Sequence, residues 1–514
     1  MSRSRCITRL YILLLCAAAC IVISSCRDKA EDHPLPNIIL FLVDDMGVMD
    51  TSVPFLTDEH GQPKRYALND FYRTPHMEEL AKSGVRFSHF YAHSVCSPTR
   101  ASIMTGQNAA RHGTTNWIRS ERNNKNEFGP SQWNWQGLDS NSITLPRLLQ
   151  SANYTTIYIG KAHLGPFNSP GENPLNLGFD VNIAGSSIGH PGSYYGTDGY
   201  GHIAGEKARA VPDLEQYHGE DVFLTEALTR EAVSAVSEAA KTGKPFFLQL
   251  SHYAVHTPFQ SDPRYADNYV SSSKSEKEQA YATLIEGIDK SLGDIVDHVR
   301  DLGLGSNTLL LFLGDNGGDA PTPIEQGYGS SIPLRGKKGN HWEGGMRVPF
   351  LASWVTPNTQ SKNQIHTPIS ANKIQTQMGT ILDLLPTVCH LAQVPLPSDQ
   401  PLDGYDLHEQ LAGRYNDLRD EDFLNHFPHQ HRSSYFTSFK KGDTKVIYHY
   451  PTEGPPAYEL YDLSSDPFES TNLSDTEPDL LTDMVESMVK EMTTMNALLP
   501  EKDNQSMKVS IPSM

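Results

Sequence analysis

Residues 37–45 read Asn-Ile-Ile-Leu-Phe-Leu-Val-Asp-Asp, an apolar run that ends at two carboxylates. A continuous apolar run of this length is typical of a strand that is buried on both faces of a sheet. Similar runs lie at 155–159, 246–250 and 309–313, and helical patterns separate them. This alternation, from residue 37 to about residue 400, predicts an α/β fold with a large, mostly parallel sheet sandwiched by helices.

Polar residues with chemical capacity follow each of the four apolar runs. They are Asp44 and Asp45, Lys161 and His163, His252 and His256, and Asp315 and Asn316. In open α/β sheets, ligands bind outside the carboxyl ends of the strands. A single acidic pair is more often a solvated turn, but four such sets predict one site at this edge of the sheet.

The segment at 96–106 reads Cys-Ser-Pro-Thr-Arg-Ala-Ser-Ile-Met-Thr-Gly. Ser97 is suited to cap a helix and Pro98 to open it, which would place Cys96 at the helix N-terminus. The helix dipole favours negative charge at that end, so an anionic nucleophile or ester would be stabilised there. The alternative is an ordinary helix start with a buried cysteine.

The same segment resembles the signature of the type I sulfatases, which is Cys-x-Pro-x-Arg followed after four residues by Thr-Gly. Every fixed position is met; Thr99 stands where the family usually has Ser. The resemblance implies an alkaline phosphatase-like fold and a maturase that oxidises Cys96 to formylglycine (3-oxoalanine). The hydrated aldehyde would attack sulfur, and its second hydroxyl would then let it collapse and expel sulfate.

A metal site is also implied by this resemblance. In sulfatases the matching positions bind one calcium ion together with the formylglycine, so the expected ligands are Asp44, Asp45, Cys96, Asp315 and Asn316. Carboxylate and carboxamide oxygens are hard donors, which suit Ca²⁺ or Mg²⁺.

Residues 154–163 resemble the second sulfatase signature, with two departures at Asn153 and Ala162. The resemblance implies that Lys161 binds sulfate oxygens. It also implies that His163 contacts the diol and acts as the base that lets it collapse.

Two further segments complete the implied site. His256, in a His-Thr-Pro turn after the run at 246–250, is the candidate general acid for the leaving alcohol. Residues 335–349 resemble the family's lysine loop, where the spacing to Glu-Gly-Gly selects Lys338 over Lys337 as the sulfate contact. Arg100 would support the nucleophile.

The first residues are typical of an export signal, because three arginines precede an apolar run at 10–23. Ser24-Ser25-Cys26 then resembles the bacterial lipobox, which implies a lipid on Cys26 of the mature protein. The alternative is a signal peptide with an incidental cysteine. The expected product is exported and anchored to a membrane of the bacterial envelope, on the periplasmic side or at the cell surface.

At 514 residues the chain is long enough for a large domain and a smaller one. The expected segments are a signal peptide at 1–25, a polar tether at 26–36, a catalytic α/β domain at 37–420, a C-terminal α+β subdomain at 421–500 and a flexible tail at 501–514. A Lys-Gly-Asp turn between 435–439 and 446–450 predicts a hairpin in the subdomain, and a helix is expected from about Glu477.

The net charge of −19, or −22 without the signal peptide, argues against nucleic acid as a partner. A site for sulfate esters must then be a local basic pocket in an acidic body. Only Cys96 and Cys389 would remain as free thiols, and Cys389 lies in an apolar stretch that is typical of a protein core.

The substrate class implied by the resemblance is a sulfated carbohydrate, of the glycosaminoglycan type or another polysaccharide. Candidates for contacts with a glycan are Trp117, Arg119, Trp133 and Trp135, and His93, His112, His190 and His341 are further candidates without a specific pattern. Two other functions remain open: a phosphonate monoester or phosphodiester hydrolase of the same superfamily, and a glycan-binding lipoprotein in which Cys96 is never modified.

Overall fold

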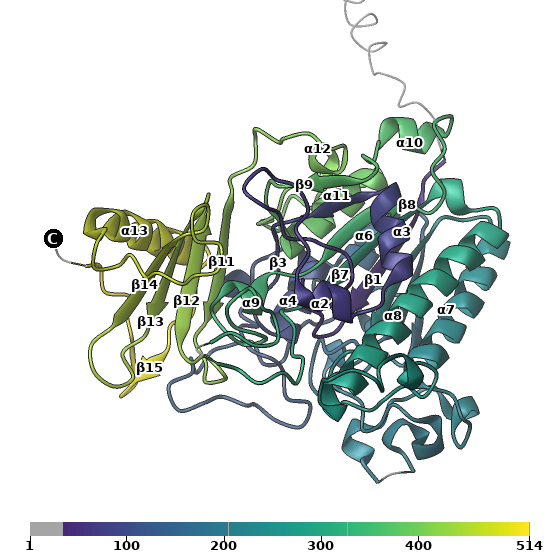
Figure 1. The fold of residues 1–514 in the computed structure, drawn as a ribbon, viewed down its shortest axis with the longest axis horizontal. Coiled ribbons are helices and arrows are strands. Elements are labelled where there is room, and N and C mark those ends of the chain that lie inside the picture. Colours follow the sequence, from purple (N-terminus) through teal and green to yellow (C-terminus); the bar gives the residue numbers. More distant parts are fainter. Residues whose placement is uncertain (1–33, 204, 326, 513–514) are drawn as a thin grey trace, which may run out of the picture. The chain divides into compact units, whose positions relative to one another are not determined.

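The computed structural model describes residues 34–203, 205–325 and 327–512. The predicted signal peptide, the predicted lipidation site Cys26 and most of the predicted tether therefore lie outside the described residues. Leu35–Met514 is one compact unit. The expected boundary near residue 420 separates two sheets within this unit, as the two halves of Figure 1 show.

The main sheet has eight strands in the order β5-β4-β6-β1-β7-β8-β2-β9. Their bounds are β1 (Asn37–Val43), β2 (Val85–Phe87), β4 (Thr155–Gly160), β5 (Val181–Ile183), β6 (Phe246–His252), β7 (Thr308–Gly314), β8 (Phe350–Trp354) and β9 (Lys373–Gln375). The four strands predicted from apolar runs are β1, β4, β6 and β7, which are neighbours and mutually parallel. Only β8 runs against its neighbours, so the mostly parallel sheet is confirmed.

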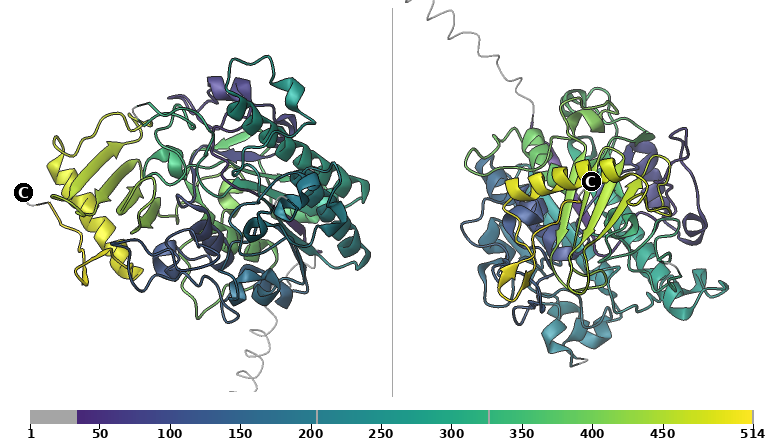
Figure 2. Two further views of the ribbon diagram at one scale, coloured as in Figure 1. Left: turned by 90° about the horizontal axis from the view of Figure 1, so that it is seen from below. Right: turned by 90° about the vertical axis from the view of Figure 1, so that its left-hand side faces the viewer.

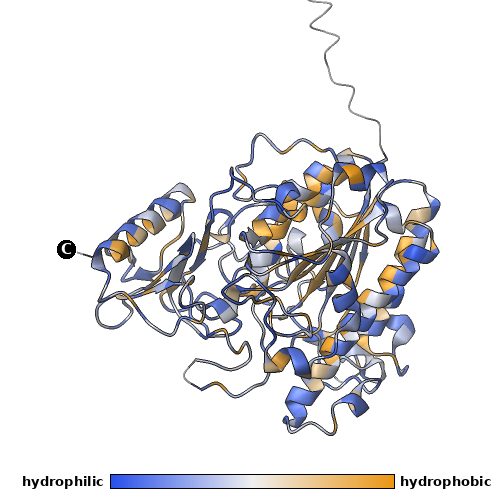
Figure 3. Cartoon of the chain, turned by 45° about the horizontal axis from the view of Figure 1, so that its top comes forward, coloured by the Kyte–Doolittle hydropathy of each residue, from blue (hydrophilic) through white to orange (hydrophobic). Residues whose placement is uncertain are grey.

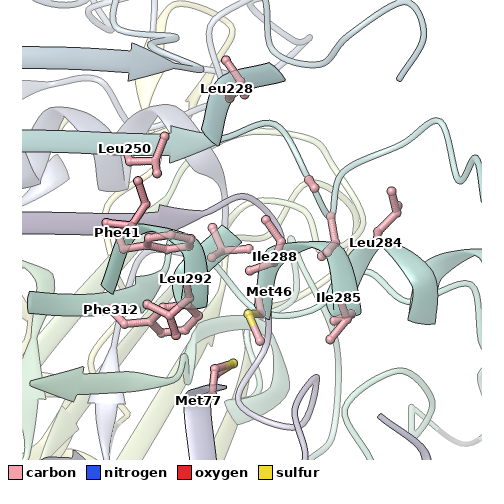
Figure 4. Packing of buried hydrophobic residues seen from close by; sticks show 14 of the residues in the cluster. Phe41, Met46, Met77, Leu228, Leu250, Leu284, Ile285, Ile288, Leu292 and Phe312 are labelled. Atoms are coloured by element: carbon pink, nitrogen blue, oxygen red, sulfur yellow. The ribbon is translucent and has the colours of Figure 1, made fainter. Parts of the chain in front are cut away.

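Helices cover both faces of this sheet. Successive side chains of a strand point to opposite faces, and in the central strands β1 and β7 both sets are mostly apolar and buried under helices. Ile39 and Phe41 of β1 pack with helices α3 (Pro75–Ser83), α7 (Leu224–Lys241) and α8 (Glu276–Asp301). Figure 4 shows Ile288 and Leu292 of α8 beside Phe41 in this layer. Leu40 and Leu42 pack on the opposite face, against helices α4 (Cys96–Thr105), α6 (Leu145–Ser151) and α11 (Leu384–Leu391).

Helix α8 shows how the sequence pattern produces this layer. Ser275 and Glu278 form a capping box at its start, and Gly303, with φ +71°, follows its end. The apolar residues recur at helical spacing and are buried. In Figure 3 the apolar stripes of α7 and α8 lie toward the sheet, whereas their polar sides lie outward.

The C-terminal sheet has four antiparallel strands, β11 (Asp422–Phe427), β12 (Phe436–Lys441), β13 (Thr444–His449) and β14 (Ala457–Asp462). The predicted hairpin is β12–β13, and the predicted helix is α13 (Pro478–Thr494). Its face, which includes Met484 and Met488, is buried. Figure 2 shows α13 lying across the sheet.

The expected flexible tail is partly ordered. Short strands β15 (Glu501–Lys502) and β16 (Gln505–Ser506) pair with each other, and Met507 and Val509 pack against the cluster that contains the apolar face of α13. These contacts involve only part of the predicted tail, and its flexibility stays a prediction.

The remaining short elements are α2 (Ala67–Phe71), α5 (Ala109–His112), α9 (Glu343–Met346), α10 (Lys362–His366), α12 (His408–Leu411), β3 (Phe90–Tyr91) and β10 (Gly379–Thr380). Among the described residues, no helix has the length and apolar character needed to cross a membrane.

Candidate active site

The acidic residues after β1 and β7 meet as predicted, because these strands are neighbours in register, with Val43 opposite Gly314. The backbone N–H of Asp45 donates to Oδ1 of Asp315 at 3.0 Å, and Nδ2 of Asn316 donates to Oδ1 of Asp45 at 2.9 Å. These residues and Asp44 are all fully buried. The strand ends thus build a compact set of three carboxylates and one carboxamide.

Cys96 is the first residue of α4 and lies beside this acidic set. Its sulfur, one oxygen of Asp44 and one of Asp315 lie within 4.8 Å of one another. The cap differs from the prediction: Val95 occupies the N-cap, and the Ser97 hydroxyl instead accepts the N–H of Ile118 at 3.0 Å. Ser97 therefore fixes the next loop rather than the helix start.

Arg100 reaches back from α4 to the acidic set. Its guanidinium donates to Oδ2 of Asp315 at 2.9 Å and to the carbonyl of Lys161 at 2.6 Å, and one nitrogen lies 3.7 Å from Asp44. The side chain is 1% exposed. Arg100 thus holds the carboxylates and the end of β4 together, and it compensates buried negative charge.

Two lysines converge on the aspartates from opposite sides. Nζ of Lys161 lies 2.6 Å from Asp44, and Nζ of Lys338 lies 2.6 Å from Asp45. Lys337 points elsewhere and pairs with Asp319 at 3.1 Å. Burial opposes the charge of Lys338, but Asp45 outweighs burial and raises the pKa of the ammonium above its ordinary value.

Close backbone contacts place these groups. Gly160 ends β4 with φ +93°, and a Cβ there would lie 2.0 Å from the carbonyl oxygen of Ser251 on β6. Glycine is therefore required for the turn that presents Lys161. Gly317 is similar: a Cβ on it would lie 2.1 Å from the carbonyl oxygen of Gly344, so the Asp-Asn-Gly-Gly and Glu-Gly-Gly segments touch backbone to backbone.

A cavity of about 240 Å³ opens above this set. Its lining residues are Cys96, Trp117, Ile118, His163, Gly189, His190, Arg209, His256, Thr257, Asp319, Lys338, His431 and Arg432. The catalytic cavity, as we call it here, thus joins Cys96, Lys338 and both predicted catalytic histidines. The aspartates, Asn316, Arg100 and Lys161 are fully or almost fully buried and do not line it.

His163 and His256 are held in different ways. Nε2 of His163 donates to the carbonyl of Ile118 at 2.6 Å, and the buried Nδ1 makes no hydrogen bond to any residue that the structure describes. Nε2 of His256 lies 3.5 Å from Asp45, and its ring stacks on His190 with centroids 5.4 Å apart. Burial lowers the pKa of both rings well below the ordinary value, and the nearby lysines lower it further.

The acidic set fits a hard divalent cation. Oδ1 of Asp44 and Oδ1 of Asn316 are buried and make no hydrogen bond to any described residue. Unpaired buried oxygens are costly unless something binds them. Carboxylate and carboxamide oxygens at several positions are the donors that Ca²⁺ and Mg²⁺ prefer.

The remaining tryptophans and histidines that were candidates from the sequence lie partly at the cavity and partly away from it. Trp117 and His190 line the catalytic cavity. His252 is instead buried against Ser291, and Trp133 is buried with its indole N–H bonded to Asn123. Away from the cavity lie Trp135, His93, His112 and His341; His93 contacts Asn425, and His341 contacts Glu459.

Four charged or titratable residues of the cavity were not predicted from the sequence, namely Arg209, Asp319, His431 and Arg432. Asp319 directly follows the Asp-Asn-Gly-Gly segment, which is the one local signal among them. Arg432 donates to both Asp319 oxygens, at 2.6 and 2.7 Å, although 113 residues separate the two.

Comparison with known proteins identifies the family to which the chain is similar. The family model described as Sulfatase matches residues 36–394, and the one described as N-sulphoglucosamine sulphohydrolase, C-terminal, matches residues 338–497. The N-acetylgalactosamine-6-sulfatase of Canis lupus familiaris is 32% identical over 391 residues, covering 74% of this chain and 66% of the canine protein. A protein named Sulfatase from Formosa agariphila is 26% identical over 510 residues, covering 88% of this chain and 87% of that protein.

Among solved structures, the crystal structure of Ps i-CgsB is similar with a TM-score of 0.69 and 28% identity, covering 89% of this chain and 93% of that one. It has also been solved in complex with k-i-k-neocarrahexaose. The chain therefore belongs to the sulfatase family, a family of sulfuric ester hydrolases with an alkaline phosphatase-like fold. Its match spans 66% of the canine relative, slightly less than two thirds of that protein's length.

Proposed function

We propose that this protein hydrolyses sulfate esters of carbohydrates, with a formylglycine made from Cys96 as nucleophile and one calcium ion held by Asp44, Asp45, Asp315 and Asn316. The observation that carries the proposal is the meeting of Cys96 with Asp44 and Asp315 at the carboxyl ends of β1 and β7, where hydrogen bonds also hold Asp45 and Asn316. Lys161 and Lys338 flank the same carboxylates, and His163 and His256 line the cavity above Cys96.

The calcium ion and the formylglycine would each supply one part of the chemistry. Calcium would neutralise negative charge on the sulfate oxygens. The hydrated formylglycine would supply an oxygen nucleophile, together with a second hydroxyl that lets sulfate leave without attack of water on sulfur. The chain's own residues bind the ester and move its protons.

Cationic side chains bind the ester in the proposed mechanism. In this proposal Lys338, which lines the cavity, and Lys161, which is paired with Asp44, attract the sulfate oxygens. Arg100 stays bonded to Asp315 and fixes the acidic set.

Histidines carry the protons. Nδ1 of His163 is the free ring nitrogen and is placed to take a proton from the nucleophile side. His256 protonates the departing alcohol oxygen. The negative charge of a bound sulfate next to its ring favours the protonated form, which offsets the effect of the two lysines on its pKa.

The substrate class rests on the relatives. The name of the canine relative specifies a sulfated N-acetylgalactosamine, and Ps i-CgsB has been solved with a carrageenan oligosaccharide. We propose a sulfated carbohydrate of this general kind as the substrate of the present protein. Trp117 at the cavity wall supplies an aromatic surface for a sugar ring.

Sulfate release tests the proposal. The protein is co-expressed with a formylglycine-generating maturase and incubated with sulfated sugars that differ in ester position, and free sulfate is measured by ion chromatography. Wild-type protein should release sulfate from at least one sugar, and Cys96→Ala should release none. Activity that survives Cys96→Ala would refute the mechanism.

A phosphonate monoester or phosphodiester hydrolase is the second candidate within the superfamily. Both reactions need the same metal, nucleophile and cations, so the site geometry alone accommodates either. Turnover of an aryl sulfate is compared with that of an aryl phosphodiester. Dominant phosphodiesterase activity would replace our proposal with this one.

Maturation and anchoring are also part of the proposal. Mass spectrometry of the peptide that contains Cys96 should show the aldehyde, whereas an unmodified thiol in active cells would favour the glycan-binding alternative. The lipid on Cys26, and with it a place in the bacterial envelope, stays a prediction. Labelling with a radioactive fatty acid, compared between wild type and Cys26→Ala, tests it.

A further inference from the structure

A second groove lies beside the catalytic cavity. Its lining residues are Asn116, Trp117, Arg119, Arg122, Asn123, Asn124, Lys125, Asn126 and Gln430. We call it the lateral groove. Trp117 lines both spaces, and Gln430 of the groove is followed in the chain by His431 and Arg432 of the cavity. The two spaces are therefore neighbours that share Trp117 as a lining residue.

The lateral groove is positively charged within an acidic protein. Its lining includes Arg119, Arg122 and Lys125 and no carboxylate. Glu121 lies nearby, 3.4 Å from Arg119, and Glu501 lies 3.8 Å from Lys125. Arg122 makes no hydrogen bond and no ion pair within the described parts of the chain, so its guanidinium is available to a ligand. A local basic groove concentrates anions even where the net charge is −19.

The loop that forms this groove is held in shape by its own amides. Nδ2 of Asn124 donates to the carbonyl of Trp117 at 3.0 Å, and Oδ1 of Asn124 accepts the N–H of Arg119 at 3.2 Å. Oδ1 of Asn126 accepts the N–H of Gln430 at 2.8 Å. These bonds fix the two chain segments that line the groove, so a ligand need not order them.

One buried donor in the groove lacks a partner. Asn116 is 1% exposed, and its Nδ2 makes no hydrogen bond to any described residue, whereas its Oδ1 accepts the N–H of Trp117 at 2.9 Å. A buried donor without a partner costs free energy. An acceptor oxygen of a ligand in the groove would satisfy it.

We propose that the lateral groove binds a second anionic group of the substrate, a sulfate or a carboxylate on a sugar next to the one that occupies the catalytic cavity. The inference rests on the proposed function. Arg122 and Arg119 match the oxygens of such a group, because guanidinium donors bind oxyanions strongly. Trp117 offers its ring between the two positions. The preferred substrate is accordingly an oligosaccharide or polysaccharide with at least two anionic groups, rather than a monosulfated single sugar.

Binding to a variant that cannot turn over separates this proposal from catalysis. The Cys96→Ala protein, in excess calcium, is titrated calorimetrically with a chondroitin 6-sulfate hexasaccharide, with neocarrahexaose sulfate and with the desulfated form of each. At least one sulfated oligosaccharide should bind, with affinity that falls as salt rises. Adding Arg122→Gln should weaken that binding about tenfold, the loss expected for one charge-assisted hydrogen bond.

Matched controls decide the outcome. Arg230→Gln removes an exposed arginine of α7 that lines neither space, and it should leave the affinity unchanged. Equal affinity for sulfated and desulfated neocarrahexaose, no binding of either sulfated sugar, or an Arg122→Gln protein that binds as tightly as its parent would overturn the proposal. Tighter binding of a single-stranded oligonucleotide of equal charge would also overturn it, in favour of nucleic acid.

Turnover provides the second readout. In the protein that retains Cys96, Arg122→Gln should raise the KM for the sulfated oligosaccharide more than the KM for an aryl sulfate. The kcat for the oligosaccharide should fall much less than its KM rises. An equal change in kcat on both substrates would indicate a structural role and overturn the proposal. Absence of sulfate release by wild-type protein would refute the proposed function but leave the binding result standing.

Discussion

Lys337 and Lys338 are adjacent in the chain, but only Lys338 contacts a residue of the acidic set. Lys338 lies against Asp45 and faces the cavity, whereas Lys337 pairs with Asp319. We predict that Lys338→Ala lowers kcat/KM for sulfate release by roughly 100-fold or more, because a preorganised cation next to the reacting charge is lost. Lys337→Ala should cost less than about fivefold. Steady-state kinetics on one sulfated substrate measure both, and circular dichroism checks that each variant is folded.

Calcium should bind the four oxygen donors with an effect on stability that does not depend on turnover. We predict that chelation abolishes sulfate release and lowers the melting temperature, and that added Ca²⁺ restores both. A ligand at 100 times its Kd stabilises the folded state by about 2.7 kcal/mol.

Asn316→Ala provides the control for the calcium site, since Oδ1 of Asn316 is buried without a partner. This variant should show a clearly smaller rise in melting temperature on addition of Ca²⁺. A full calcium shift in Asn316→Ala would remove Asn316 from the ligand set.

At the scale of elements, the sequence predicted the strands better than the contacts between loops. The runs at 38–43 and 309–313 are apolar throughout and are followed by carboxylate and carboxamide side chains. The sequence therefore predicts both the strands and the polar residues at their ends. The cap of α4 was not, because the Ser97 hydroxyl bonds to the N–H of Ile118, and a tertiary partner cannot be read from local spacing. The need for glycine at position 160, at the end of β4, is evident only from the fold, because the backbone of Ser251 leaves no room for a side chain there.

A carboxylate from one helix caps another in a way that no local pattern shows. Asp289 of α8 accepts the N–H groups of His76 and Met77, at 3.0 and 2.8 Å, in the first turn of α3. We predict that Asp289→Ala lowers the free energy of unfolding by about 1–3 kcal/mol at about pH 5.5, because the two donors lose their acceptor. Asp289→Asn, which keeps an acceptor, should cost less. Asp294→Ala, at an exposed site on the same helix, should change stability by less than about 0.5 kcal/mol.

The same residue predicts a pH dependence with a definite sign. Burial raises the pKa of Asp289 from 3.8 to about 7. Between these values the folded protein binds a proton that the unfolded chain releases, so its contribution to stability falls as pH rises. The free energy of unfolding of wild type relative to Asp289→Asn should therefore decline from about pH 4 to about pH 7. Urea titrations at several pH values test this, and a difference that grows with pH would contradict it.

For the whole molecule, the site draws on segments from residue 44 to residue 432, and the sequence indicated the motifs that resemble sulfatase signatures but not the other residues that line the cavity. Lys161, Lys338 and the aspartates belong to motifs with fixed spacing. Arg432 comes from the loop between β11 and β12 and has no such spacing, although it forms an ion pair with Asp319 at the cavity. Residues that set the shape of the cavity depend on how the C-terminal sheet packs, which only the fold provides.

A buried ion cluster joins that sheet to the lysine loop. Lys445 of β13 lies 3.1 Å from Glu343 of α9 and 2.6 Å from Glu469, and all three are nearly inaccessible to solvent. We predict that Lys445→Met lowers the free energy of unfolding by about 3 kcal/mol, since buried Glu469 loses its cation and Glu343 keeps its ion pair with Arg347.

Calorimetry tests whether this cluster couples the two sheets. Because Glu343 begins the short helix within the lysine loop, loss of Lys445 should destabilise both sheets together, and the variant should still melt in a single transition at lower temperature. Lys441→Met, at the exposed end of β12, should melt as wild type does. If Lys445→Met instead produced a separate early transition, with the remainder melting as before, the C-terminal sheet would be an independent folding unit and the coupling argued here would be wrong.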